Sequence, residues 1–119
     1  MIEILFGTPP DRGNAREHWR TVNKKKNLFY EECDNKQLLG LIPPPPKRPI
    51  TKCKVEAHFK LHNPNDWDNL YARLKYPLDW LETRGYILDD SPRVIIEAPV
   101  VTQEVDRKNK CLSVTITPT

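Results

Sequence analysis

The chain has 119 residues, with 19 Lys and Arg against 16 Asp and Glu, for a net charge of +3. This length can bury enough surface to fold without cross-links, so we expect one domain over residues 1–119. Its three cysteines are widely spaced and form no C-x-x-C pair, which disfavours a disulfide framework or a zinc site. No apolar run approaches the roughly 18 residues of a membrane span, and the apolar start is too short for a signal peptide. We therefore expect a cytoplasmic protein with no membrane partner.

The first third of the chain predicts a strand and a helix. Ile2, Ile4 and Phe6 alternate as in a short strand, which the glycine and prolines of residues 7–10 end. Asn14 and Glu17 are spaced as a capping pair for a helix beginning near Ala15. We expect this helix to run for about 18 to 20 residues.

A run of four prolines, Pro43 to Pro46, follows the predicted helix. Such a run cannot be helical and favours an extended polyproline connection. We interpret it as a stiff spacer before the next strand. The alternative is a ligand for a proline-binding domain.

The clearest alternation lies in residues 55–61, where apolar residues at every second position predict a strand with one buried face. Asp66 and Asp68 come soon after it. If the extended conformation continues to this point, a period of two places both carboxylates on the same side, where they can share a cation.

The remaining pattern predicts a second helix and two more strands. Apolar residues recur at helical spacing from Leu70 to Leu81, with Gly85 as the stop signal and a kink or restart at Pro77. Strands are expected at residues 94–96 and 112–116. The fold class is therefore α+β, a single domain in the order β-α-β-α-β-β, with two main helices packed on a mixed or antiparallel sheet.

Four carboxylates stand at the two ends of the second predicted helix: Asp66 and Asp68 before it, Asp89 and Asp90 after it. Residues 84–89, if extended, are long enough to return along the helix, so the two groups can meet. Crowded carboxylates repel one another unless a divalent cation neutralises them. Alternatively, Asp66 or Asp68 caps the helix, and Asp89 and Asp90 belong to a turn.

The order of these residues resembles the RusA family of Holliday-junction resolvases, in particular its phage-borne members. The residues that carry the similarity are Asp66-Trp67-Asp68-Asn69, Lys75 followed by Asp79, and Gly85-Tyr86-Ile87-Leu88-Asp89-Asp90-Ser91. Pro9-Pro10 and residues 14–20 are also similar to the family's amino-terminal pattern.

This resemblance implies a homodimeric endonuclease that nicks four-way DNA junctions with Mg²⁺ in recombination and repair. Asp66, Asp68 and Asp90 match metal-binding aspartates, Lys75 matches an essential lysine, and Asp79 and Asp89 match acidic positions, of which we include Asp89 among the metal ligands. The protein would act in the cytoplasm of a bacterial host, as a host or phage product. Two alternatives stay open: a DNA-binding protein that cuts weakly or not at all, and a metal-dependent phosphodiesterase acting on flaps or RNA.

The chemistry of these residue types suits such an activity. Magnesium prefers hard oxygen ligands, and a lysine can stabilise charge that develops on a phosphate. Outside the acidic residues the chain is cationic, as suits a polyanionic substrate. The residues that we expect to contact DNA are Arg16, Arg20, Lys24, Lys25, Lys26 and Arg73; ordinary solvated surface is the alternative.

Overall fold

A computed structural model of the protein describes residues 1–11 and 19–119. The elements are β1 (Ile2–Phe6), α1 (Trp19–Leu38), β2 (Cys53–Leu61), α2 (Trp67–Thr83), β3 (Val100–Val105) and β4 (Cys111–Pro118). The expected order of elements is confirmed, and the protein is a single α+β domain.

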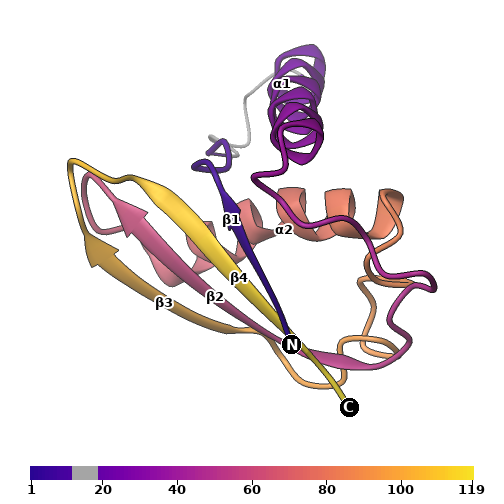
Figure 1. The fold of residues 1–119 in the computed structure, drawn as a ribbon. Coiled ribbons are helices and arrows are strands. Elements are labelled where there is room, and N and C mark those ends of the chain that lie inside the picture. Colours follow the sequence, from indigo (N-terminus) through magenta and orange to yellow (C-terminus); the bar gives the residue numbers. More distant parts are fainter. Residues whose placement is uncertain (12–18) are drawn as a thin grey trace.

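The four strands form one mixed sheet in the order β1-β4-β2-β3. β4 pairs antiparallel with both β1 and β2, whereas β2 and β3 are parallel. Adjacent parallel strands require a crossover connection, and α2 provides it by lying across one face of the sheet (Figure 1). The segment after α2 must therefore return along the helix before β3 begins.

The core lies between α2 and the sheet. Alternate residues of β2 and β4 are buried, and they face a buried helical stripe on α2 that includes Leu70, Leu74 and Leu81. α1 joins this core through aromatic contacts: the ring of Phe6 lies 6.1 Å from that of Phe29 and 5.8 Å from that of Trp80. These contacts hold α1 against α2 and the end of β1.

Two details differ from the sequence-based expectations. Residues 94–96 form no strand: Val94 and Ile95 are buried in a turn with a single bridge from Ile95 to Cys53, and the third strand is β3. α2 continues through Pro77 without the expected restart. The lost helical hydrogen bond at Pro77 is offset because Pro77 is itself buried in the core face of the helix.

The predicted capping pair of α1 falls outside the described residues, and so does the start near Ala15; the described helix has 20 residues. Among the described helices, none combines the length and the apolar character that crossing a membrane requires.

Candidate functional site

Asp66 and Asp68 lie at the amino-terminal end of α2. Because the helix begins at Trp67, Asp66 is the N-cap residue, with extended backbone angles of φ −63° and ψ 147°, and Asp68 belongs to the first turn. The extended conformation therefore does not continue through both residues, and the predicted alternation does not hold. The Asp66 carboxylate makes no capping hydrogen bond, and both side chains are exposed.

Lys75, in the middle of α2, is in direct contact with Asp90 on the segment that follows the helix. Nζ of Lys75 donates a hydrogen bond to Oδ2 of Asp90 at 2.7 Å and lies 3.5 Å from Oδ1 of Asp79. The Asp90 side chain is 17% exposed and that of Lys75 is 52% exposed. The lysine can therefore meet a solvent-borne ligand while it holds the less exposed carboxylate.

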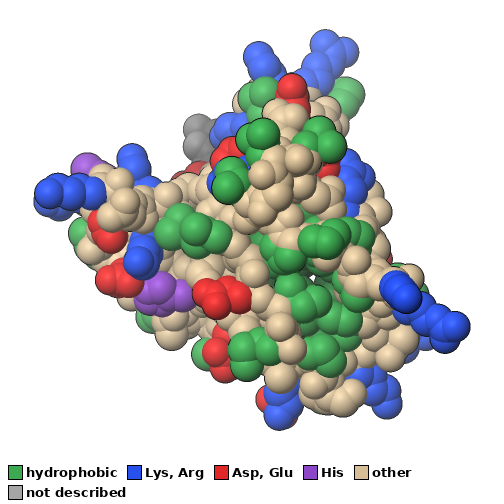
Figure 2. Space-filling model, viewed as in Figure 1, with side chains coloured by type: hydrophobic (Ala, Val, Ile, Leu, Met, Phe, Trp, Pro, Cys, Tyr) green, Lys and Arg blue, Asp and Glu red, His purple; other side chains and the backbone are tan. Residues whose placement is uncertain are grey.

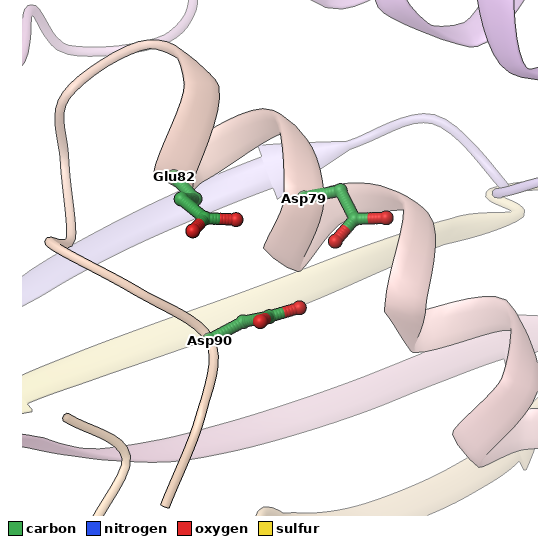
Figure 3. A group of neighbouring side chains, drawn as sticks. All are labelled: Asp79, Glu82 and Asp90. Atoms are coloured by element: carbon green, nitrogen blue, oxygen red, sulfur yellow. The ribbon is translucent and has the colours of Figure 1, made fainter. Parts of the chain in front are cut away.

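Three carboxylates gather around this contact. One oxygen each from Asp79, Glu82 and Asp90 lies within 4.8 Å of the others. Figure 3 shows Asp79 and Glu82 on α2 and Asp90 on the segment that returns beside it. We call Asp79, Glu82 and Asp90 the acidic group. The sequence interpretation did not include Glu82, although its position seven residues after Lys75 and three after Asp79 places all three on one helix face.

The three carboxylates of the acidic group differ in their affinity for protons. Partial burial raises the pKa of Asp79, and a side-chain hydrogen bond with Asp90 raises it further. Partial burial and the charges of Asp90, Asp89 and Asp79 raise the pKa of Glu82. The Lys75 hydrogen bond instead lowers the pKa of Asp90 and raises that of Lys75. Asp90 is thus the carboxylate best held in its charged form.

The other predicted ligands lie outside the acidic group. Asp68 precedes Asp79 by 11 positions, which is about 16 Å along a helix, too far for both to hold one cation. Asp89 adjoins Asp90, but its Oδ1 accepts a hydrogen bond from the Ser91 backbone N–H at 2.9 Å, as in the turn that was the alternative interpretation. The structure therefore brings together Lys75, Asp90 and Asp79, and leaves Asp66 and Asp68 at the opposite end of α2.

Two features hold the segment that carries Asp90. Gly85 ends α2 with a left-handed φ of +83°, a conformation that favours glycine. Beyond it, the backbone of Ile50 pairs with this segment, accepting from the N–H of Leu88 and donating to the carbonyl of Tyr86, each at 3.0 Å. The position of Asp90 thus depends on contacts from the connection between α1 and β2.

A pocket of about 380 Å³ adjoins the acidic group. Lys75 and Asp90 form part of its wall, and most of the rest is apolar, from α2 and from residues 92–99. Tyr71, one turn after Asp68, also lines it and donates a hydrogen bond to the Pro99 carbonyl at 2.9 Å. The pocket therefore extends along α2 from the acidic group toward the end that carries Asp68.

The predicted DNA-contacting cations have different surroundings. Arg73 is only 8% exposed, and its guanidinium donates two hydrogen bonds to the carbonyl of Pro9, so it stabilises the interior rather than offering charge at the surface. Arg20 is exposed beside the ring of Trp19, and Lys26 lies over the ring of Tyr30. Lys24 is exposed and Lys25 is half-buried, while Arg16 lies outside the described residues.

The acidic group has the donor chemistry that a magnesium ion requires. Its atoms are hard carboxylate oxygens, partly shielded from water, with raised pKa values at Asp79 and Glu82 that a bound cation would lower again. Asp79, Glu82 and Asp90 therefore fit a divalent cation with water completing its shell. Comparisons of the sequence with protein-family models and with curated proteins found no match.

Proposed function

We propose that this protein is a magnesium-dependent, structure-selective DNA endonuclease that resolves four-way junctions by paired nicks. The observation that carries the proposal is the contact between Lys75 and Asp90, with Asp79 beside them. All three residues belong to the sequence pattern that resembles the junction resolvases, and they come from two segments that meet only in the folded chain.

The residues have distinct roles in this proposal. Asp90, Asp79 and Glu82 would hold Mg²⁺, which supplies charge neutralisation at the scissile phosphate and a more acidic bound water. The exposed ammonium of Lys75 would donate to a phosphate oxygen on which charge develops. The resemblance also implies catalytic and metal-binding roles for Asp66 and Asp68, but the acidic group would hold its cation without them, since they lie outside it.

The test is nicking of a synthetic four-way junction, with linear duplex of the same sequence as the comparison substrate. We expect cleavage of the junction with Mg²⁺ and none with EDTA. Asp90→Asn should abolish cleavage while junction binding is kept. The matched control is Glu31→Gln, which removes an exposed carboxylate of α1; it should cut like the unchanged protein. Equal cleavage by Asp90→Asn would refute the assignment of the site.

A DNA-binding protein that cuts weakly or not at all is the second candidate. One observation favours it: Lys75 already neutralises Asp90 by a 2.7 Å contact, and a carboxylate with such a partner needs no metal ion for its charge to be balanced. Binding of the junction without nicking in Mg²⁺ or Mn²⁺ would support this second candidate against the first.

The proposal includes a homodimer and a cytoplasmic location in a bacterial host, as a host or phage product. Two symmetric nicks require two sites, and each chain supplies one acidic group among its described residues. A two-fold symmetric dimer would match the two-fold symmetry of the junction.

A further inference from the structure

The connection between α1 and β2 packs against the rest of the protein near both of its ends. At its start, Ile42 is 1% exposed, and the hydroxyl of Tyr86 donates a hydrogen bond to the carbonyl of Pro43. The same hydroxyl accepts from Nε2 of Gln37 at 2.9 Å. At its end, Ile50 pairs with the backbone of residues 86–88. Four consecutive prolines with fixed φ lie between these attachments, so the loop is stiff.

This loop carries two cations that its surroundings do not neutralise. Lys47 and Arg48 are exposed, and neither has an ion-pair partner among the described residues. Some other cations of the fold are paired: Lys54 lies 3.5 Å from Glu97, and Arg84 lies 2.7 Å from Asp34. At the end of the molecule where the loop lies in Figure 1, Lys and Arg side chains project outward (Figure 2).

The loop lies close to the acidic group in space, although it is distant from it in the sequence. Ile50 pairs with Leu88, which is two residues before Asp90, and Arg48 is two residues before Ile50. The path from Arg48 to Asp90 runs over two residues to Ile50, across one strand spacing to Leu88, and over two residues to Asp90. Even if both short segments are fully extended, the Cα atoms of Arg48 and Asp90 lie at most about 20 Å apart. Phosphates on one DNA strand follow one another at about 3.4 Å along the axis. Lys47 and Arg48 can therefore reach phosphates within roughly six nucleotides of a bond held at Asp90.

We infer that Lys47 and Arg48 form a rigid contact to the DNA backbone that sets the distance between a bound duplex arm and the acidic group. This inference rests on the proposed endonuclease function and extends it to how the substrate is positioned. A stiff loop suits the role because a preorganised contact loses little entropy on binding.

The surroundings favour DNA over a proline-binding domain as the partner of the loop. Such a domain must reach along the polyproline segment, but Pro43 has its carbonyl bonded to Tyr86 and Pro46 is half-buried. Lys47 and Arg48 are exposed side by side on the loop, and a phosphate backbone offers the anionic acceptors that such cations bind in charge-assisted hydrogen bonds.

The experiment measures junction affinity against salt concentration in Ca²⁺ or EDTA, where no cleavage is required. The test variant is Lys47→Gln/Arg48→Gln. Loss of two phosphate contacts should lower the slope of log affinity against log salt by about 1.8 and weaken binding. The matched control is Lys108→Gln/Lys110→Gln, which removes the same charge from the β3–β4 turn at the opposite end of the sheet (Figure 1); it should change the slope less.

A second variant separates stiffness from charge. Pro44→Gly/Pro45→Gly keeps both cations, so it should leave the salt slope unchanged and weaken junction binding by roughly threefold to tenfold. If the junction arms are shorter than about six nucleotides, the unchanged protein and Lys47→Gln/Arg48→Gln should bind the junction with the same affinity.

The outcomes distinguish this inference from the proposed function. If the protein nicks junctions but Lys47→Gln/Arg48→Gln has unchanged affinity and slope, the inference is wrong and the loop is left as a spacer or a protein ligand. If the protein binds junctions and never nicks them, the nuclease proposal fails, while a reduced slope in the loop variant still supports a backbone contact. Absence of any DNA binding overturns both.

Discussion

Nζ of Lys75 lies 2.7 Å from Oδ2 of Asp90, although the two residues belong to a helix and to the segment that returns after it. The ammonium acts as the counter-charge of the acidic group and lowers the pKa of Asp90. A divalent cation and Lys75 would therefore share the same carboxylates. Replacing Lys75 should therefore change Mg²⁺ affinity and the rate of cleavage in opposite directions.

Replacing Lys75 by Met keeps most of the length of the side chain and removes its charge. We expect cleavage of a four-way junction to fall by about 100-fold, since a donor aimed at developing phosphate charge is lost. Affinity for Mg²⁺, measured by calorimetry, should rise because Asp90 loses a competing cation. The comparison variant is Lys36→Met, which breaks a partly exposed ion pair with Glu32 and should alter neither quantity. Unchanged cleavage by Lys75→Met would exclude a role for the ammonium.

The acidic group makes a specific prediction about which carboxylates bind the metal. Glu82→Gln and Asp90→Asn should each weaken Mg²⁺ binding by about tenfold or more, because each removes a ligand charge. Asp68→Asn should keep the Mg²⁺ affinity, since its carboxylate is about 16 Å along the helix from Asp79. Calorimetric titration without DNA measures all three. If Asp68→Asn lost metal binding, a single site containing Asp68 and Asp90 would replace the acidic group that we describe.

The contact between Asp34 and Arg84 should contribute to stability in a pH-dependent way. Nε and Nη2 of Arg84 donate to the two oxygens of Asp34 at 2.8 and 2.7 Å, and Nε1 of Trp80 donates to Oδ1 at 2.9 Å. The Arg84 hydrogen bond lowers the pKa of Asp34. The stabilisation is therefore complete above the pKa of about 3.9 of the unfolded chain and is lost as pH falls through the folded value.

We expect Asp34→Ala to destabilise the protein by about 1 kcal/mol at pH 7, a value that allows for the partial exposure of both side chains. Urea denaturation at pH 7 and at pH 3 measures it, and the difference should shrink at the lower pH. Asp34→Asn retains an acceptor for Trp80 and should cost less at pH 7. An effect of Asp34→Ala that is equal at both pH values would assign the loss to packing instead of charge.

The variant Gly85→Ala tests the left-handed backbone conformation at the end of α2, from which the chain continues to Asp90. The φ of Gly85 is +83°, and apart from its chain neighbours no described residue has an atom within 4 Å of the position that a Cβ would occupy. Gly85→Ala should therefore destabilise the fold by about 1 kcal/mol through backbone strain alone. Thermal unfolding checks this, with Gly40→Ala as the comparison because its φ is +77° in equally open surroundings. Full stability in Gly85→Ala would contradict the left-handed end of α2.

The homodimer prediction is tested by light scattering at micromolar concentration. The free protein is expected to have a mass of twice 13.9 kDa, and its complex with junction DNA should contain two chains. The exposed edge strand β1, with Leu5 at 56% exposure, is a candidate contact. A mass of one chain in the presence of a junction would exclude paired nicking within one dimer.

Much of this fold follows from patterns that are local in the sequence. Alternation in residues 55–61, helical spacing from Leu70 to Leu81 and the glycine after them predict β2, α2 and the end of α2, because burial on one face imposes those periods. The same local signals placed a strand at residues 94–96, where two buried residues instead pack within a turn. Burial alone does not distinguish a strand from an irregular core segment.

The sequence by itself determined that acidic residues and a lysine accompany α2 and the segment after it. Which of them meet was decided by tertiary structure. The helix begins at Trp67, and its rigid rise carries Asp68 away from Asp79, while the turn at Gly85 and the pairing of Ile50 with Leu88 bring Asp90 back to Lys75. Proximity between distant residues depends on the direction of the returning chain, which comes from packing against other segments and leaves no periodic signal in the sequence.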